Sequence, residues 1–396
     1  MNIELTYVLV TPYTLKKSRT GGILARLLSR TDLDFVSAQI VRFDQKSAEK
    51  YAQQVEETMS KDNELIGTLA GEYIRENFSP NKATGRMHRA FLLLFRGENA
   101  CQKITDIVGT FRNIDNSSIV YGETIRDTYA DLVFEKNSKK EVKFFEPAVF
   151  TPKTQELAIP KLNLLANVAR NSDNIISLTR SAEELSAFEK TLVIIKPDNW
   201  RHPSSRPGNI IDMLSRTSLE IVGCKTYRMS VNQALEFYGP VKDVLREKLA
   251  PSIAENAAET LEHKFAVALD ERDVELLRKS IGDRYAIQQF EEIIKFMAGS
   301  KPSECAENEL DDPGKVKCMV LIYEGINAVQ KIRDVLGPTD PTKAPGGTVR
   351  RDFGSNVMVN TAHASDSVVS YEREQKILQA HKNTLCDVID NFLNVR

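Results

Sequence analysis

The sequence predicts an α+β fold (an α/β sandwich) built from two ferredoxin-like βαββαβ domains. Two observations carry this prediction: a long segment of the chain occurs twice, and in both copies the strand-like and helix-like patterns follow one another in the same order. The chain has 396 residues, of which 41% are hydrophobic, so each copy has enough apolar residues to bury a core of its own.

The repeat is visible in three pairs of segments. RLLSRTDLDFVSAQIVRF (26–43) aligns with DMLSRTSLEIVGCKTYRM (212–229), GENACQKITDIVG (97–109) with GINAVQKIRDVLG (325–337), and GETIRDTY (122–129) with GGTVRRDF (346–353). The segments of the second pair lie 42 residues farther apart than those of the first pair. We therefore place a helical insertion of about 42 residues in the second copy.

The elements of each copy can be assigned in order along the chain. An apolar run predicts a first strand (YVLV, 7–10; LVIIK, 192–196), a helical pattern follows, and FVSAQIVRF and IVGCKTYRM predict a second strand. After a further helical stretch come a buried strand (AFLLLF, 90–95; CMVLIYEG, 318–325) and an amphipathic helix. In the second copy NVMVNTA (356–362) predicts a final strand, followed by a terminal helix. This order predicts an antiparallel sheet with helices on one face.

The domain boundaries follow from the repeat. We predict a first copy over residues 1–150, a packed linker over 151–188 and a second copy over 189–396. The linker is too apolar for a free tether, and a capping box from Ser181 to Glu184 predicts a short helix in it. The insertion covers about 244–297, where apolar residues at helical spacing among strong helix formers predict two or three additional helices.

Composition argues against several classes of function. The formal charge of −2, from 53 basic and 55 acidic residues spread along the chain, provides no basic face for nucleic acid. The five cysteines show no CxxC spacing, which indicates reduced thiols in an intracellular, cytoplasmic protein. The longest strongly apolar stretch, AFLLLF, is far shorter than the ~18 residues that a membrane span needs, and no secretion signal is apparent, so we expect no membrane partner.

Four segments of the second copy carry a resemblance to a known family. TLVIIKPDNW (191–200), YEGINAVQKIRDVLGPTDP (323–341), PGGTVRRDF (345–353) and NTAHASDSVVSYEREQ (360–375) resemble, in this order, the signature segments of nucleoside diphosphate kinase. The resemblance covers about 187–380 apart from the insertion. The first copy looks like a diverged version of the same domain.

The resemblance implies a covalent carrier of the phosphoryl group. A neutral imidazole is a competent nucleophile near neutral pH, and His363 matches the histidine that carries phosphate in the family. Glu374, 11 residues farther on, matches the glutamate that orients the ring, and Ser365 matches a serine that supports this glutamate. Tyr238 matches a tyrosine near the histidine.

The resemblance also implies how the phosphates are held. The phosphoryl group carries charge on three oxygens, so catalysis depends on cations and hydrogen-bond donors directed at them. Lys196, Arg333 and Arg350 match the cations that bind phosphate in the family, and Thr339 matches the hydroxyl that does so. Asn360 matches an asparagine that contacts the sugar. The substrates implied are nucleoside triphosphates and diphosphates, with Mg²⁺ bridging phosphate oxygens and few direct protein ligands.

Taken singly, each of these residues has an ordinary interpretation. An isolated histidine is usually structural, Lys196 could end an exposed strand, and Arg333 could be a surface charge on an amphipathic helix. The joint occurrence in the right order favours the catalytic interpretation. The first copy has Thr11 in place of Lys196 and Thr105 in place of Arg333, and residues 89–201 contain no histidine, so we predict that this copy is inactive.

Other hypotheses stay open at this point. Ala364, Pro338 and Arg351 depart from the family pattern, and no aromatic residue is available between 241 and 249 to stack on a base. A nucleotide-sensing or interaction protein without turnover, or a histidine phosphocarrier, could use the same fold. The two copies could form an intrachain pseudo-dimer, and further homo-oligomers are possible.

Overall fold

The structure is a computed structural model that describes residues 3–111, 122–136, 141–177 and 187–394. Residues 1–226 and 319–396 form one compact unit, which contains both copies, and residues 227–318 form a second unit. The predicted capping box from Ser181 to Glu184 lies outside the described residues.

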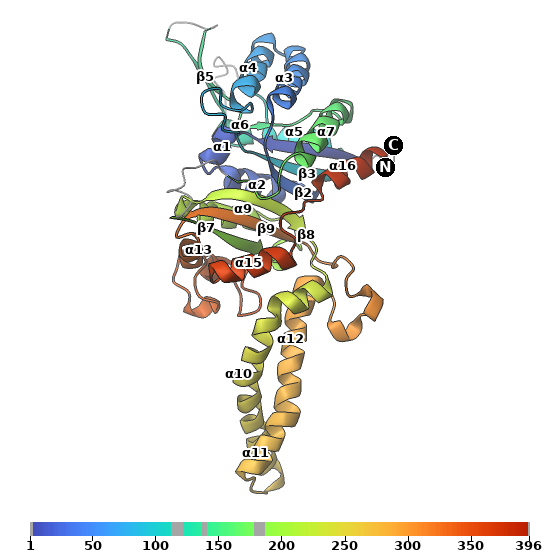
Figure 1. Cartoon of the computed structure of the whole chain (residues 1–396), viewed down its shortest axis with the longest axis vertical. Helices are drawn as coiled ribbons and strands as arrows, with labels where there is room; N and C mark the ends of the chain where they lie inside the picture. The colour runs from blue at the N-terminus through green and yellow to red at the C-terminus, as the bar shows by residue number, and fades with distance from the viewer. Residues whose placement is uncertain (1–2, 112–121, 137–140, 178–186, 395–396) are drawn as a thin grey trace. The chain divides into compact units, whose positions relative to one another are not determined.

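Each copy contains a sheet (Figure 1). The strand order of the two sheets is the same. The order is β2-β3-β1-β6 in the first copy and β10-β7-β9-β8 in the second, which in both cases is the ferredoxin-like order. The strands are β1 (Ile3–Val10), β2 (Asp34–Val41), β3 (Ala90–Glu98) and β6 (Val149–Phe150), and β7 (Phe188–Ile195), β8 (Glu220–Tyr227), β9 (Cys318–Ile326) and β10 (Ala362–Ala364). The predicted fold class is therefore confirmed. A further antiparallel pair, β4 (Asp131–Phe134) and β5 (Val142–Glu146), belongs to the first copy alone.

The helices of the two copies also correspond. Those of the first copy are α1 (Pro12–Lys16), α2 (Thr20–Ser29), α3 (Gln45–Ser60), α4 (Glu64–Asn77), α5 (Ala100–Val108), α6 (Ile125–Tyr129) and α7 (Gln155–Arg170). Those of the second copy in the same unit are α9 (Arg206–Leu214), α13 (Ala328–Leu336), α14 (Val349–Phe353), α15 (Val368–Ile377) and α16 (Leu385–Asn394), with short 3₁₀ turns η1 (Pro197–Asn199), η2 (Ser215–Thr217) and η6 (Pro341–Lys343).

Small backbone details recur in both copies. Before α5 and α13 the chain adopts a left-handed conformation at Asn99 and Asn327, with φ of 52° and 54°. Both helices end at a glycine of positive φ, Gly109 at 77° and Gly337 at 79°, where a residue with a side chain would be strained. Shared positions of this kind in both halves support a duplication.

The core of the first copy extends beyond the predicted boundary at residue 150. Leu5, Tyr7 and Leu9 of β1 are fully buried against side chains of α7, such as Leu162 and Leu165. Helix α7, within the predicted linker, is therefore part of the first copy, in which it takes the place that α15 takes in the second. Helices thus cover more than the one face of the sheet that the sequence predicted.

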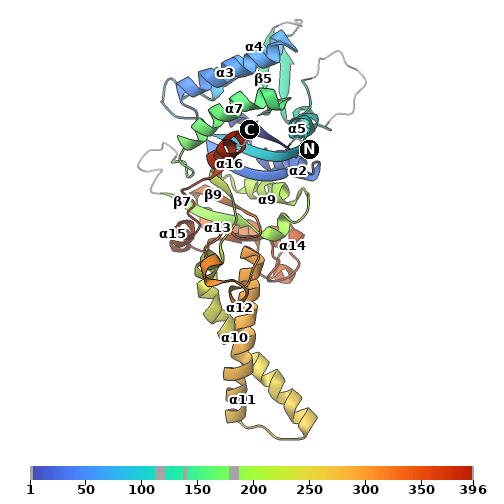
Figure 2. The same cartoon turned by 90° about the vertical axis from the view of Figure 1, so that its right-hand side faces the viewer.

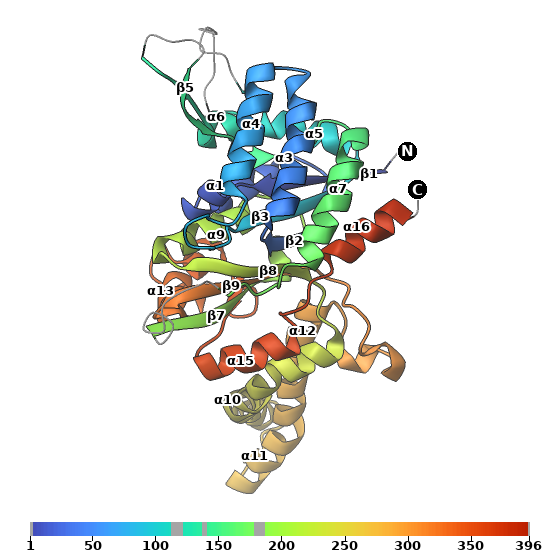
Figure 3. The same cartoon turned by 45° about the horizontal axis from the view of Figure 1, so that its top comes forward.

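The last helix of the chain crosses back to the first copy. Helix α16 packs beside α7 (Figures 2 and 3). Its Leu385 and Ile389 are completely buried in the same core. The range 189–396 that we assigned to the second copy therefore includes a segment that completes the first. Burial of two apolar side chains explains this exchange, because each gains roughly 1.5–3 kcal/mol relative to exposure.

The two copies pack against each other inside this unit, as the pseudo-dimer hypothesis expected. Helices α2 and α9 lie side by side (Figure 1), and at their crossing Gly21 and Gly208 allow backbone to meet backbone. Asn383 donates hydrogen bonds to Asn174 Oδ1 at 2.7 Å and to the carbonyl of Ala38 at 3.0 Å. Polar and backbone contacts therefore fix the relation between the copies.

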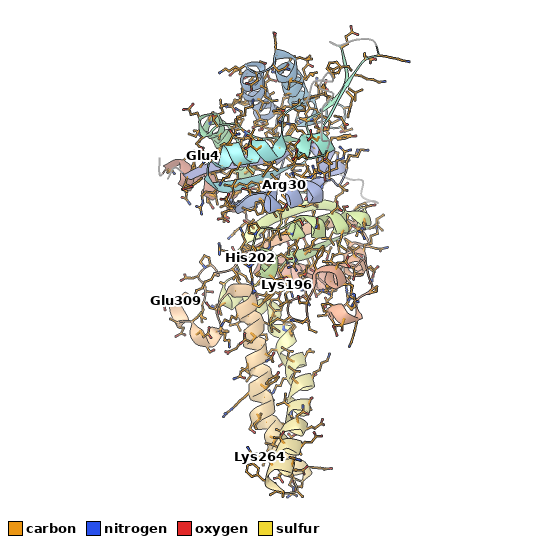
Figure 4. All side chains as sticks on the ribbon, turned by 180° about the vertical axis from the view of Figure 1, so that it is seen from behind. Glu4, Arg30, Lys196, His202, Lys264 and Glu309 are labelled. Atoms are coloured by element: carbon orange, nitrogen blue, oxygen red, sulfur yellow. The ribbon has the colours of Figure 1, made fainter. Side chains whose placement is uncertain are left out.

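The second unit, residues 227–318, is mainly a helical hairpin. It contains α10 (Val231–Phe265), α11 (Glu271–Leu277), a π-helical turn (Arg278–Gly282) and α12 (Asp283–Ala298), followed by 3₁₀ turns at Pro302–Glu304 and Glu307–Glu309. Helix α10 has 35 residues and begins at Val231, before the predicted insertion. The first part of the insertion is therefore a continuation of this helix. Lys264 near the end of α10 and Glu309 lie at opposite ends of this unit (Figure 4). Arg246 of α10 forms an ion pair with Asp283 of α12 at 2.6 Å.

The final strand of the second copy differs from the predicted one. The structure assigns β10 to Ala362–Ala364, and the apolar run 356–359 is a turn. Asn356 explains the difference, because its side chain accepts hydrogen bonds from the N–H groups of Met358 and Val359 and so competes with strand pairing. His363 consequently lies inside a strand.

Among the described residues, no helix combines the length and apolar character that crossing a membrane requires.

The helix crossing gives a testable prediction for stability. A Cβ atom on Gly208 would lie 2.2 Å from Ala25 N and 2.4 Å from Gly21 O, and both are backbone atoms. We expect Gly208→Ala to lower the stability by about 1–3 kcal/mol, because the helices must separate. Calorimetry of thermal unfolding measures this loss.

Gly346→Ala is the matched control, since a Cβ atom there meets nothing within 4 Å. Its effect should stay within about 0.5 kcal/mol. Equal stability of the two variants would show that α2 and α9 are not in close contact.

Candidate active site

His363 is the central residue of β10, which pairs antiparallel with β7 and places His363 opposite Ile194. Successive side chains on a strand point to opposite faces, so the imidazole leaves the sheet on the face opposite to Ala362 and Ala364. The His363 side chain is 22% exposed, which leaves it accessible from solvent. The predicted strand ended at residue 362, whereas the structure includes His363 in the strand.

Glu374 and Ser365 form one hydrogen-bonded network with His363. Helix α15, which starts after the N-cap Ser367, carries Glu374 to a point where its Oε1 lies 3.0 Å from His363 Nε2. The hydroxyl of Ser365 donates to Glu374 Oε2 at 2.6 Å. Glu374 is 3% exposed and Ser365 is fully buried, so both carboxylate oxygens are held in a site that excludes water.

This network selects one tautomer of the imidazole. A carboxylate accepts hydrogen bonds, so Nε2 carries the proton and donates it to Glu374. In the neutral ring the lone pair then lies on Nδ1. The arrangement makes Nδ1 the nucleophilic nitrogen and provides a negative charge on the other side of the ring.

Lys196 lies directly after β7, beside the chain segment that leads to His363. Its N–H donates to the carbonyl of Thr361 at 2.9 Å, and its Nζ donates to Asn360 Oδ1 at 2.6 Å. Burial, followed by the charge of Arg350, lowers the pKa of Lys196 to about 8. The ammonium group is thus charged at neutral pH but is easily deprotonated for a lysine.

The turn after Lys196 contains residues for which the sequence analysis assigned no role. Asn199 donates to the carbonyls of Lys196 and Thr361, at 3.1 and 2.9 Å, and so joins the ends of β7 and β10. Arg206 donates to the carbonyl of Phe353 at 2.7 Å and forms an ion pair with the buried Asp198 at 3.5 Å. Asp198 and Asn199 are part of the motif KPDNW, which the sequence analysis quoted. Only the fold shows that Asn199 and Arg206 hold the backbone in place by hydrogen bonds to its carbonyl groups.

Arg350 is located between two segments of the site. Its guanidinium donates to the carbonyl of Gly337 at 2.8 Å and to that of Ala362 at 3.0 Å. In the first copy Arg126 donates to the carbonyls of Gly109 and Val149 in the same way. Because the first copy keeps the arginine but has no counterpart of His363, one part of the role of this arginine is to tie the backbone together.

Arg333 and Thr339 lie at the exposed margin of the site. Arg333, on α13, donates to the carbonyl of Asp366 at 3.0 Å, just after the histidine strand. The carbonyl of Thr339 accepts from Asn360 Nδ2 at 3.1 Å, so Asn360 bridges Thr339 and Lys196. These predicted residues are thus brought to one region.

The remaining predicted residue, Tyr238, belongs to the other compact unit. It lies in α10 and is 8% exposed, with its ring 5.0 Å from that of Phe237. The predicted site is therefore assembled from His363, Glu374, Ser365, Lys196, Asn360, Arg350, Arg333 and Thr339, all in the unit that contains the two copies.

The first copy has different residues at the equivalent positions. Val10 lies opposite Val149 as Ile195 lies opposite Ala362, so Phe150 takes the position of His363. Lys161 is as far from the N-cap of α7 as Glu374 is from the N-cap of α15. A buried phenyl ring and a lysine cannot perform the chemistry of an imidazole and a carboxylate.

In the first copy a buried carboxyl group interacts with the counterpart of Lys196. Thr11, the counterpart of Lys196, donates to Glu146 at 2.6 Å, and Tyr73 donates to the other carboxyl oxygen at 2.5 Å. Glu146 is 1% exposed, and burial raises its pKa. A carboxyl group repels phosphate when charged, so this part of the first copy is unsuited to hold it.

The donor set of the second-copy site limits how Mg²⁺ could bind. The described residues contain no group of three or more His, Cys, Asp or Glu side chains that could hold a metal ion. The site instead presents Lys196, Arg350 and Arg333, which suit phosphate oxygens. These residues fit Mg²⁺ only as part of a nucleotide complex, in which phosphate oxygens and water supply the ligands.

The sequence and structure were compared with known proteins. A family model described as nucleoside diphosphate kinase matches residues 283–384. A nucleoside diphosphate kinase from Hyperthermus butylicus is 48% identical over 59 residues, which are 15% of this chain and 42% of that protein. One from Saccharolobus islandicus is 28% identical over 190 residues, which are 48% of this chain and 94% of that protein.

Solved structures were compared with this chain as well. An NDP kinase from Pyrobaculum aerophilum is 25% identical, with a TM-score of 0.32, and covers 48% of this chain and 94% of its own. The nucleoside diphosphate kinase from Aquifex aeolicus is 21% identical, with a TM-score of 0.29 and the same coverage.

The sequence match includes the part of the site that contains the histidine. Residues 283–384 contain His363, Glu374 and Arg350, together with the other predicted site residues after α12. Through its second copy, this chain is similar to the nucleoside diphosphate kinase family.

Proposed function

We propose that the second copy transfers the γ-phosphoryl group of a nucleoside triphosphate to a nucleoside diphosphate through a phosphohistidine at His363. The observation that carries this proposal is the hydrogen-bonded series Ser365–Glu374–His363, with separations of 2.6 and 3.0 Å. A histidine oriented by a buried carboxylate is prepared for nucleophilic attack. The match of residues 283–384 to the family model supports the same conclusion.

In the first half-reaction, Nδ1 of His363 attacks the γ-phosphorus of the triphosphate. An N–P bond forms, the bond from phosphorus to the bridging oxygen breaks, and the nucleoside diphosphate leaves with the electron pair. The ring gains positive charge, which the carboxylate of Glu374 stabilises while Nε2 keeps its proton. A second nucleoside diphosphate then takes the phosphoryl group by the reverse of these steps, and ping-pong kinetics follow.

The cations of the site stabilise charge on the transferred group. Lys196 and Arg350 flank the strand of His363, and Arg333 holds the segment that follows it. Fixed positive groups of this kind lower the barrier, because negative charge develops on the phosphoryl and leaving oxygens. Mg²⁺, bound to the nucleotide phosphates, would neutralise further charge there.

The first copy acts in this proposal as a scaffold. Its counterpart of His363 is Phe150, and its counterpart of Lys196 is held by Glu146, so it supplies no carrier. It packs on the second copy through α2 and α9 and accepts α16 from it. A cytoplasmic location belongs to the same proposal, because free thiols such as Cys224 persist in a reducing compartment.

Labelling with γ-³²P-ATP tests the carrier. We expect acid-labile, base-stable label on the wild-type protein that GDP or UDP discharges, and no label on His363→Ala, because the nitrogen that accepts phosphate is gone. His381→Ala is the matched control, since His381 is exposed and outside the site. Label that no diphosphate discharges would indicate a phosphocarrier, and unlabelled wild-type protein would indicate a nucleotide sensor.

Substitution of Glu374 tests the role of the carboxylate. Glu374→Gln keeps the shape of the side chain but removes the charge that stabilises the imidazolium ring, so we expect kcat to fall about 10²-fold. Stopped-flow measurement of phosphohistidine formation is the direct readout. Glu372→Gln, at an exposed position of the same helix, is the control. It should change the rate by less than a factor of two, which corresponds to about 0.4 kcal/mol in activation free energy. Equal losses in both variants would contradict an orienting role for Glu374.

The pH dependence tests Lys196. Its pKa is lowered to about 8, so the charged form dominates below that pH and is lost as the pH rises through it. We therefore expect kcat/KM to fall above about pH 8 and Lys196→Arg to lack this alkaline decrease, because guanidinium stays charged. A decrease at the same pH in the variant would assign the titration to another group.

A further inference from the structure

Asp198 is a buried carboxylate beside the histidine site that has no role in the reaction described above. It is the second residue after Lys196, in the turn η1, and its side chain is 5% exposed. Burial raises the pKa of Asp198, and the charges of Arg206, Lys196 and Arg201 lower it. A charged group is costly to bury, so this carboxylate needs compensation by nearby cations.

Arg206 provides only part of this compensation. The distance from Arg206 Nη2 to Asp198 Oδ2 is 3.5 Å, whereas hydrogen bonds between charged groups usually measure about 2.7–2.9 Å. The shorter hydrogen bond of the same guanidinium, at 2.7 Å, goes to the carbonyl of Phe353. The side chain of Arg206 is 34% exposed, so water weakens its attraction to Asp198 further.

The first copy shows that an arginine in this place does not require a carboxylate. Arg19 donates to the carbonyl of Tyr129 at 3.0 Å, and the alignment of the copies pairs Tyr129 with Phe353. At the position of Asp198 the first copy has Tyr13, and the guanidinium of Arg19 lies over its ring, 5.9 Å from the centroid. An aromatic ring is therefore a sufficient partner for the arginine.

The carboxylate instead occurs together with the lysine. The second copy has Lys196 and Asp198, and the first copy has Thr11 and Tyr13 at the same two positions, on either side of a proline. Both charges are thus present in the copy that has the histidine and absent from the copy that lacks it. This joint occurrence indicates that Asp198 acts on the buried ammonium group of Lys196.

The surroundings of Lys196 disfavour a positive charge. Its pKa is lowered to about 8 by burial and by Arg350 of α14, and Asp198 opposes this decrease. Its Nζ donates to Asn360 Oδ1 at 2.6 Å, but this amide oxygen is neutral. His363, the titratable group of the neighbouring strand β10, gains positive charge in the proposed reaction. Without the carboxylate, buried cations would repel one another here.

We propose that Asp198 is a positioning residue of the histidine site, whose carboxylate keeps the Lys196 ammonium group protonated for phosphate binding. Asp198 acts through Lys196 and not by contact with the nucleotide. This role deepens the function proposed above and rests on it, because Lys196 binds phosphate in that function. The protonation of Lys196 does not depend on turnover, so it can be measured separately.

NMR of the protein without nucleotide measures this protonation. The ¹³Cε chemical shift of Lys196, assigned with Lys196→Arg, reports the loss of the proton as the pH rises. In the wild-type protein the midpoint should lie at about pH 8. In Asp198→Asn it should be about one pH unit lower, because a nearby negative charge favours the ammonium form. Asp198→Glu keeps the charge and should keep the midpoint near that of the wild type, and Asp198→Ser is the alternative if Asp198→Asn does not fold.

The pH profile of kcat/KM is the second measurement. The decrease expected above about pH 8 should begin about one unit lower in Asp198→Asn, because the charged form of Lys196 is lost earlier as the pH rises. Adding Lys196→Arg to Asp198→Asn should remove this decrease, since guanidinium stays charged. Asp212→Asn, at an exposed position of α9, is the matched control and should leave the profile unchanged.

Two results would overturn the proposal. An unchanged midpoint of Lys196 in Asp198→Asn would show that the carboxylate does not act on the ammonium group. An equal loss of kcat/KM at every pH would show that Asp198 only holds the turn in place. A wild-type protein without phosphoryl transfer would contradict the function proposed for the site, whereas the NMR midpoints would still decide whether Asp198 acts on Lys196.

Discussion

The site depends on the pairing of a three-residue strand, β10, with β7. This pairing places His363 opposite Ile194 and brings the carbonyl of Thr361 to the N–H of Lys196. So short a strand has little pairing energy of its own, and two further hydrogen bonds hold its start: Asn199 donates to the carbonyl of Thr361, just before the strand, and Arg350 donates to the carbonyl of Ala362. Polar side chains thus fix the backbone of this region by hydrogen bonds. The backbone in turn determines the positions of the His363 imidazole and the Lys196 ammonium group.

The two copies show which parts of the domain are needed for folding and which for chemistry. Strand order, the left-handed residues before α5 and α13, and the arginine that ties two carbonyls together are common to both. The imidazole, its carboxylate and the buried ammonium group occur only in the second copy. At the positions of the imidazole and of Lys196 the first copy carries Phe150 and Thr11 instead.

The interface between the copies has two halves that correspond by the repeat but differ in their packing. One half contains the stacked rings of Phe35 and Trp200, and the other contains a cavity beside Leu15. In two identical chains a substitution would alter both halves, whereas fusion in one chain lets each half change alone. The exchange of α16, which completes the core of the first copy, ties the halves together in the same chain.

Hydrophobic pattern and repeated segments were sufficient to predict the strand order and the pair of domains, because periodicity is a local property of the chain. The set His363, Glu374, Lys196 and Arg350 was predicted from the resemblance of short segments to nucleoside diphosphate kinase. Three features depended on contacts between distant residues and could not be predicted: the return of α16 to the first copy, the strand at Ala362–Ala364 and the cavity beside Tyr323. Each depends on packing and hydrogen bonding between residues that come together only when the chain has folded.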